Sequence, residues 1–314
     1  MIWGKTLAAV LQADELAPDA EFLGGSPSAG FDWIHRRDSG TDIYFVSNQK
    51  AAPATAEIAF RLAGRQPELW DAVTGLTRDL PEFREQEGRL LVPMRFAPRQ
   101  SYFVVFRRAA VSRHSAGAGP ANFPKREEIA RVAGPWEVSF DPKWGGPAQV
   151  TFDTLGDWTR RPEEGIRYYS GTAIYRTTFD LAASEKGRLF LNLGLVKNLA
   201  AVKLNGRDLG VVWTAPWCVD ITDSVQQRSN RLEVAVVNLW PNRLIGDSKL
   251  PPERRFAKTN VKTYLGLPPD FSLPGGCKTC EARRKADNPD QFLLPSGLLG
   301  PVTVEWEGER PREP

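Results

Sequence analysis

The chain has 314 residues, of which 41% are hydrophobic and 25% charged, and its formal net charge is +3. This length allows two domains with a core each, and so small and mixed a charge gives no reason to expect nucleic acid or an anionic membrane as a partner. No apolar run approaches the roughly 20 residues that span a bilayer.

The first residues predict no export signal, because they lack the basic, apolar and small-residue regions of a signal peptide. Localisation therefore stays unknown. Residues 1–30 are expected to form a short N-terminal helix followed by a Gly/Ser/Pro loop.

Short β-branched and aromatic runs follow, such as TDIYFVSNQ and TAEIAFRL, and they predict antiparallel strands separated by turn residues. One pair is expected to form a hairpin that turns at Thr74–Gly75. We therefore predict a small β-sandwich over residues 31–110. The small residues, Gly and Pro over 111–130 indicate a linker.

A second β-unit is predicted over residues 131–308. Its strongest local signal is KLNGRDLG, an Asn-Gly hairpin, and about eight strands with long connections describe a jelly roll. Residues 247–294 are irregular, basic and rich in Pro and Gly, so we expect a long loop over one end of the sandwich. The predicted fold class is mainly β, with two antiparallel β-sandwich domains and no TIM barrel, because no βαβα alternation occurs.

Three cysteines and two histidines exclude a disulfide framework and a histidine-rich metal centre. Cys277 and Cys280 are spaced as half of a zinc site, but neither Cys218 nor a nearby histidine completes it. Reduced thiols or a local bridge are the expected state, and no metal or cofactor is predicted.

The stretch NLWPNRLIGD, from Asn238 to Asp247, leaves a clean strand pattern for a cluster of planar polar groups. Trp240 would offer an aromatic face to the C–H side of a sugar, and Asn242 and Arg243 would offer hydrogen bonds to its hydroxyls. The alternative is structural: Trp240 packs at the core edge, while Arg243 and Asp247 form an internal ion pair.

Two further tryptophans, Trp213 and Trp217, stand four residues apart around a proline. A turn or bulge there would bring both rings to one rim of the sandwich, where a ligand could bind, although packing explains them equally well. In RPEEGIRYYSG, Arg167 and Tyr168 are additional candidates for sugar contact.

Candidate catalytic carboxylates are weak. Glycosidases need two carboxyl groups about 5 Å apart for retention or about 6.5–9.5 Å apart for inversion. Adjacent Glu163 and Glu164 would point in opposite directions on a strand, so a pair would need Asp220 or Asp247 across a cleft. Asp32 is the fifth candidate.

The segment DWIHRRD contains His35 between charged residues. On a strand, Asp32 and Arg36 share one face, while His35 and Arg37 share the other. His35 with its flanking arginines could bind an acidic sugar; the alternative is an ion-pair network at a domain junction.

Four segments, GIRYYSGTAIYRTTFDL, VKLNGRDLGVVWTAPWCVDIT, NLWPNRLIGD and LPSGLLGPV, resemble the C-terminal galactose-binding-like β-sandwich of glycoside hydrolase family 106. Members of this family are α-L-rhamnosidases. More loosely, the segments resemble the sugar-binding domain of family 2 hydrolases. FDWIHRRDSGTDIYFVSNQ is similar to the segment just downstream of the family's catalytic barrel, so the resemblance covers roughly residues 20–306.

The resemblance implies a barrel-less part of a rhamnosidase-like enzyme. The family's catalytic (β/α)₈ barrel would lie N-terminal to Met1, so its acid and base carboxylates have no positions here, and full-length relatives are expected to be exported. By fold analogy alone, a structural Ca²⁺ could use Asp141, Asp153 or Asp220.

Three functions remain as hypotheses. The first is a carbohydrate-recognition and accessory module of a rhamnosidase-like glycoside hydrolase. The second is a small self-contained glycosidase with two Asp/Glu residues between the β-domains. The third is a protein-interaction scaffold whose exposed tryptophans mark an interface.

Overall fold

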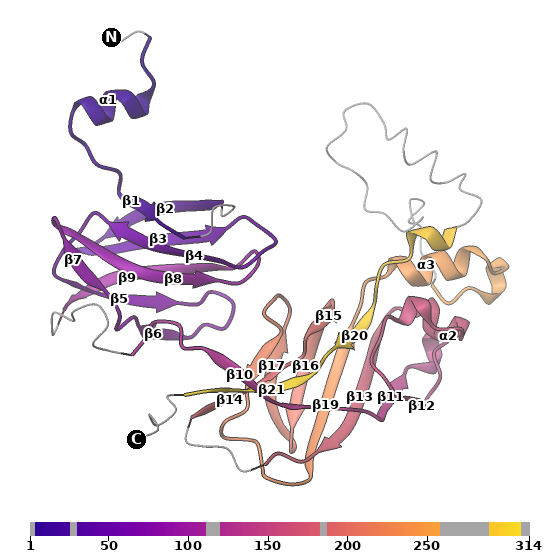
Figure 1. Cartoon of the computed structure of the whole chain (residues 1–314). Helices are drawn as coiled ribbons and strands as arrows, with labels where there is room; N and C mark the ends of the chain where they lie inside the picture. The colour runs from indigo at the N-terminus through magenta and orange to yellow at the C-terminus, as the bar shows by residue number, and fades with distance from the viewer. Residues whose placement is uncertain (1–3, 26–29, 111–119, 183–186, 258–288, 309–314) are drawn as a thin grey trace. The chain divides into compact units, whose positions relative to one another are not determined.

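The computed structural model describes residues 4–25, 30–110, 120–182, 187–257 and 289–308. The chain divides into two compact units, residues 1–125 and 126–314. Both are built from antiparallel sheets, and one short helix, α1 (Leu7–Ala13), lies near the N-terminus (Figure 1). The prediction of a mainly β chain with antiparallel sandwich domains is confirmed, and the sheets of the described residues do not close into a barrel.

Unit 1 has a four-stranded and a five-stranded sheet. In the order of pairing, the first contains β1 (Ala20–Leu23), β4 (Ala54–Phe60), β8 (Arg89–Phe96) and β7 (Arg84–Gln86), and the second contains β2 (Phe31–Asp38), β3 (Thr41–Asn48), β9 (Ser101–Ala109), β5 (Arg65–Trp70) and β6 (Thr77–Asp79). Alternate residues of these strands, such as Ile58 and Phe60, are buried in one core. The hairpin predicted at Thr74–Gly75 joins β5 to β6, and Gly75 takes a positive φ of 72°.

Two boundaries of unit 1 differ from the prediction. Residues 20–23, expected in a loop, form the edge strand β1, which pairs with β4. Four residues are too few for alternation to reveal a strand. Asn122, expected in the linker, is fully buried, and its side chain exchanges hydrogen bonds with the backbone of Glu82 at 2.6 and 2.8 Å. The segment around it is therefore anchored to unit 1.

Unit 2 has a six-stranded and a four-stranded sheet, with a further strand pair. In the order of pairing, the first contains β12 (Val150–Phe152), β11 (Trp136–Phe140), β13 (Thr172–Phe179), β19 (Asn230–Val237), β16 (Leu199–Leu204) and β17 (Arg207–Val212), the second contains β10 (Arg126–Arg131), β21 (Thr303–Glu307), β14 (Arg188–Asn192) and β18 (Cys218–Asp220), and the pair is β15 (Leu195–Lys197) with β20 (Gly297–Gly300). The predicted Asn-Gly hairpin joins β16 to β17, with positive φ angles of 53° at Asn205 and 82° at Gly206.

The motif NLWPNRLIGD forms a helix, α3 (Pro241–Ser248), where the sequence predicted a strand end leading into a loop. Pro241 lies at the first helical position, where its missing N–H costs no hydrogen bond. The predicted loop 247–294 therefore starts inside α3 and continues with the short helix η3 (Pro252–Arg254). Residues 258–288, including Cys277 and Cys280, lie outside the described residues.

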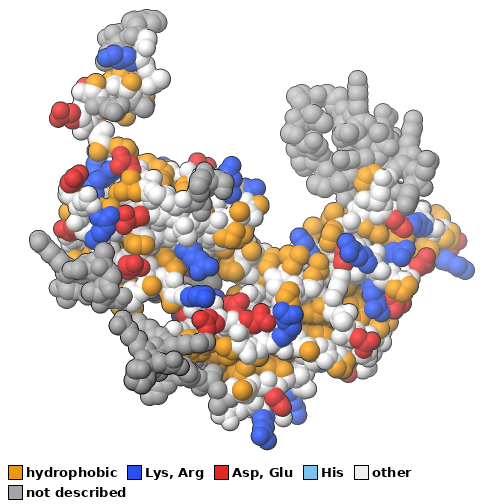
Figure 2. Space-filling model, viewed as in Figure 1, with side chains coloured by type: hydrophobic (Ala, Val, Ile, Leu, Met, Phe, Trp, Pro, Cys, Tyr) orange, Lys and Arg blue, Asp and Glu red, His pale blue; other side chains and the backbone are white. Residues whose placement is uncertain are grey.

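Short helices gather at one end of unit 2. Beside α3 lies α2 (Glu164–Arg167) (Figure 1), and the 3₁₀ helices η1 (Pro142–Trp144), η2 (Trp158–Arg160) and η4 (Pro289–Phe292) complete the set. Within the described ranges, no helix is both long and apolar enough to cross a bilayer. On the face shown in Figure 2, basic and acidic side chains are interspersed rather than separated by sign, as the small net charge predicts.

Candidate functional site

The polar residues of α3 are enclosed. Asn242, Arg243 and Asp247 are 1%, 3% and 4% exposed. The prediction that these side chains face an open rim is therefore wrong, because the motif is helical and the three residues lie on its buried side. Their role is the structural one.

Asn242 and Asn238 fix the end of the sandwich through Ser296. The amide Nδ2 atoms of Asn238 and Asn242 each donate to Ser296 Oγ at 3.0 Å. Asn242 also donates to the carbonyl of Leu294 and accepts from its N–H, both at 2.8 Å. Asn238 Nδ2 donates to the carbonyl of Tyr169 at 2.9 Å. Buried amides satisfied in this way link α3, β19 and the segment before β20.

Arg243 and Asp247 form a buried ion pair, with Arg243 Nε 3.1 Å from Asp247 Oδ1. Burial lowers the pKa of Arg243, and the Asp247 carboxylate opposes that shift. Arg243 also donates to the carbonyl of Trp144 at 3.2 Å, and Asp247 accepts from the backbone N–H of Phe256 and Ala257. This pair therefore ties α3 to η1 and to the segment after η3.

Gly246 is required by the same packing. A Cβ at this position would lie 2.5 Å from Arg243 Nη2 and 2.6 Å from the Cβ of Tyr168. No larger residue fits without moving a buried guanidinium or an aromatic side chain.

Trp240 differs from the rest of the motif, because 50% of it is exposed. It precedes Pro241 at the start of α3, and its ring meets that of Trp144 edge to face, with centroids 5.0 Å apart and an interplanar angle of 80°. The backbone of Trp144 is held in place by the hydrogen bond that its carbonyl accepts from the buried Arg243. We call the pair Trp144 and Trp240 the aromatic rim.

Trp213 and Trp217 do not share a surface role. Trp213 is 57% exposed just beyond the edge strand β17. Trp217 packs against the core of unit 2, and its carbonyl accepts a hydrogen bond from Leu193. The structure thus exposes one of these rings and packs the other.

Tyr168 is buried and donates from its hydroxyl to both carboxylate oxygens of Asp290, at 2.8 and 3.0 Å. Lys249 Nζ lies 2.6 Å from that hydroxyl and from Asp290 Oδ1. Burial alone would raise the pKa of Asp290, but the hydrogen bonds from Lys249 and Tyr168 outweigh it and lower the pKa. The half-buried Arg167 donates to the carbonyl of Arg161 at 3.1 Å. These contacts stabilise the end of the sandwich.

Most of the candidate carboxylates are bound by arginines. Arg161 holds Glu163 through two hydrogen bonds of 2.7 and 3.0 Å, which lower the pKa of that carboxyl. At Asp220, burial raises the pKa, but the hydrogen bonds from Thr222 and Arg188 lower it by more than burial raises it. The net shift of the pKa is therefore downward.

Glu164 is exposed, Asp247 is the buried partner of Arg243, and Asp32 is exposed on β2 of unit 1. Within unit 2, none of these contacts joins two candidate carboxylates to each other.

His35 lies between two carboxylates of unit 1. Its Nδ1 is 3.2 Å from Asp19 Oδ2, its Nε2 is 2.9 Å from Asp42 Oδ1, and its ring stacks on Tyr44 with centroids 4.1 Å apart. Arg37 Nε lies 3.9 Å from Asp42, so His35 and Arg37 share a face, as predicted. The ion-pair alternative describes this arrangement better than a ligand site.

A structural Ca²⁺ was expected by fold analogy alone. In the described part of the chain, no three His, Cys, Asp or Glu side chains form a group able to hold a metal. Asp141 caps η1 by accepting from the N–H of Lys143. Asp220 is committed to Arg188 and Thr222.

Comparison with known proteins agrees with this architecture. Residues 1–85 match the family model for glycoside hydrolase family 106, described as alpha-L-rhamnosidase, and residues 158–263 match that for a glycosyl hydrolase 2 galactose-binding domain-like module. A solved rhamnosidase from Novosphingobium sp. PP1Y superposes over 96% of the chain with 33% identity and a TM-score of 0.80. The resemblance to family 106 is confirmed.

The chain is much shorter than these relatives. It covers 26% of the Novosphingobium rhamnosidase. A Formosa agariphila protein, named provisionally as a beta-glucuronidase, is 41% identical over 181 residues, which are 55% of this chain and 15% of that protein. The similarity therefore concerns one part of larger glycoside hydrolases.

Two residues important to this end of unit 2 escaped the sequence prediction. Trp144 stands between turn residues in DPKWGGP, where a large aromatic is unusual enough to suggest exposure. Ser296 had no recognisable partner, because Asn238 and Asn242 lie more than fifty residues away in sequence. Only the fold brings these three together.

Proposed function

We propose that this chain is the carbohydrate-recognition and accessory portion of a rhamnosidase-like glycoside hydrolase, and that it holds a sugar on the aromatic rim formed by Trp144 and Trp240. The observation that carries the proposal is the half-exposed indole of Trp240, set edge to face against a second tryptophan. An exposed aromatic ring can stack on the C–H side of a sugar ring. This contact buries apolar area of both rings and needs no charged group on the sugar.

The buried cluster below the aromatic rim supports this function indirectly. Asn242, Arg243 and Asp247 use their polar groups to fix α3 and η1. Both rim tryptophans therefore start from ordered positions, so less conformational entropy is lost when a ligand binds.

The self-contained glycosidase is less well supported. A general acid needs a raised pKa. The pKa of Glu163 is instead lowered by its hydrogen bonds with Arg161, and that of Asp220 is lowered by hydrogen bonds from Thr222 and Arg188. Asp247 is enclosed and paired with Arg243. We propose instead that hydrolysis belongs to a separate catalytic barrel, which this module would assist.

The proposal is tested by titrating the 314-residue chain with methyl α-L-rhamnoside and with an oligosaccharide that ends in L-rhamnose, using isothermal titration calorimetry. We expect weak binding, with a Kd from about 10 μM to several millimolar. Trp240→Ala and Trp144→Ala should each weaken it at least fivefold, because a stacked aromatic contributes about 1 kcal/mol.

Trp213→Ala is the matched control, since Trp213 is equally exposed but lies outside the aromatic rim. Equal loss of affinity in that variant, or no binding by the wild type, would contradict the proposed site. In parallel, the chain should release no 4-nitrophenol from 4-nitrophenyl α-L-rhamnoside. Hydrolysis by the wild type that disappears in Glu163→Gln or Asp220→Asn would favour the self-contained glycosidase.

A further inference from the structure

The outer face of the six-stranded sheet of unit 2 carries a hollow of about 850 Å³. Ligand pockets commonly measure about 300–1,000 Å³. The alternation of β19 explains its lining, because Val234 and Val236 point into the core while Arg231 and Glu233 lie on the opposite face. None of the predicted site residues lines it.

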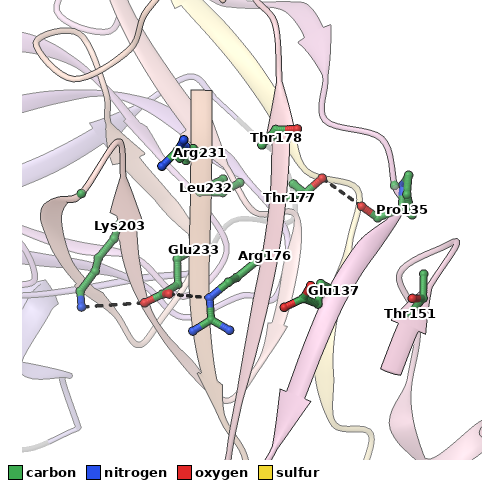
Figure 3. A pocket seen from close by; sticks show the side chains of 12 residues that line it. Pro135, Glu137, Thr151, Arg176, Thr177, Thr178, Lys203, Arg231, Leu232 and Glu233 are labelled. Carbon is green, nitrogen blue, oxygen red and sulfur yellow. Dashed lines mark hydrogen bonds and ion pairs between the residues drawn. The ribbon is translucent and has the colours of Figure 1, made fainter. Parts of the chain in front are cut away.

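A row of alternating charges crosses this face. Glu137 lies opposite Arg176, which lies opposite Glu233, which lies opposite Lys203. Arg176 Nε donates to Glu233 Oε2 at 2.9 Å, and Lys203 Nζ is 3.8 Å from Glu233 Oε1 (Figure 3). Arg176 also donates to Ser139 Oγ at 3.4 Å. These bonds use two of the five N–H groups of the Arg176 guanidinium, and no other described residue accepts from the remaining three, which can bind a ligand.

Arg231 occupies the next row, opposite Thr178. Its guanidinium is exposed and makes no hydrogen bond or ion pair with any residue in the described ranges, and both residues line the hollow (Figure 3). The lining as a whole has three cations and two carboxylates, an excess of one positive charge. An unpaired arginine at a polar hollow favours an anionic ligand.

The lining also says what kind of anion fits. None of the twelve lining residues is aromatic, so a neutral sugar has no ring on which to stack. The Thr178 hydroxyl and the Glu137 carboxylate can instead hydrogen-bond sugar hydroxyls. From β11 to β16 the sheet crosses three inter-strand spacings, about 14 Å, which suits a short chain of sugars rather than one ring.

We propose that this hollow binds an oligosaccharide of uronic-acid units, with Arg231 pairing a sugar carboxylate and Arg176 and Lys203 supporting the anionic chain. From the proposed function the inference takes only the class of ligand, carbohydrate. The site is separate from the aromatic rim, because Arg231 lies at the start of β19 and Trp240 follows its end, and the strand from Arg231 to Val237 is about 20 Å long.

The test is calorimetric titration of the whole chain at low salt with trigalacturonic acid and with its fully methyl-esterified form. We expect the acid to bind at least tenfold more tightly than the neutral ester, and the affinity to fall as NaCl rises from about 20 to 300 mM. Arg231→Gln and Lys203→Gln should each weaken binding about threefold to fivefold, as expected for an exposed ion pair. Arg254→Gln, an exposed cation on η3, is the matched control and should change nothing.

Each other outcome overturns the site. Equal affinity for acid and ester, or unchanged affinity in Arg231→Gln, would remove the charge recognition. Equally tight binding of a hexaglutamate peptide would assign the hollow to acidic protein segments instead. Trp240→Ala should leave trigalacturonate binding intact, so failure here and failure at the aromatic rim are separately visible.

Discussion

The substitution Asn242→Ala tests the buried polar cluster most sharply. It removes three hydrogen bonds, two donated by Asn242 and one accepted from the N–H of Leu294. The carbonyl of Leu294 keeps a partner, since Ser296 Oγ donates to it at 2.9 Å, but the N–H of Leu294 loses the Asn242 oxygen. One unsatisfied donor and two lost bonds together cost about 3 kcal/mol of the free energy of unfolding.

Differential scanning calorimetry of the full chain measures this loss. For a unit of about 190 residues, 3 kcal/mol lowers the Tm by roughly 6–12 °C. Arg254→Ala, an exposed change near the same helix, should stay within about 0.5 kcal/mol. If Asn242→Ala cost less than about 1 kcal/mol, the cluster would not be what holds α3, and the structural interpretation of the motif would fail.

Three further predictions concern stability. Gly246→Ala should destabilise unit 2 by about 2 kcal/mol through overpacking, whereas Gly156→Ala, with no atom within 4 Å of the added Cβ, should be nearly neutral in the same urea titration. Because the pKa of Asp290 is lowered in the folded state, its contribution is present above its ordinary pKa and is lost as pH falls through the lower folded value; Asp290→Asn should therefore flatten the loss of Tm below about pH 4, and an unchanged pH profile would contradict this. Glu68→Gln should destabilise unit 1 by about 2 kcal/mol at pH 7, because the buried carboxylate binds Arg107 and Arg108; an unchanged urea midpoint would show that these ion pairs contribute nothing.

Local patterns were sufficient for several strands and for two hairpins. Alternation over five or more residues identified β4 and β19, and the Asn-Gly pair identified the β16–β17 turn. They failed where the fold decides: β1 is too short for a period, and α3 begins at a proline directly after a strand, with its polar residues turned inward.

At the candidate site too, some features could be predicted from the sequence, and others depend on the fold. Trp240 could be picked from its chemistry, yet its exposure and its neighbour Trp144 depend on η1 and α3 meeting in space. The same polar residues, Asn242, Arg243 and Asp247, are compatible with a sugar-binding surface or with a buried structural cluster, because the sequence does not state which side of a helix is covered. The contacts of Asn242 and Arg243 show that these residues belong to the buried structural cluster.

In the proposed function, the exposed indole of Trp240 contacts sugar, while the rest of its motif only holds it in place. The most direct measurement is two-dimensional ¹H–¹⁵N NMR of the ten tryptophan indole N–H signals during titration with an oligosaccharide that ends in L-rhamnose. Shifts at Trp240 and Trp144, with the buried Trp158 and with Trp213, which lies outside the aromatic rim, unmoved, are the predicted result. Saturating sugar that leaves the Trp240 signal in place, or that moves only the Trp213 signal, would show that the aromatic rim does not bind the sugar.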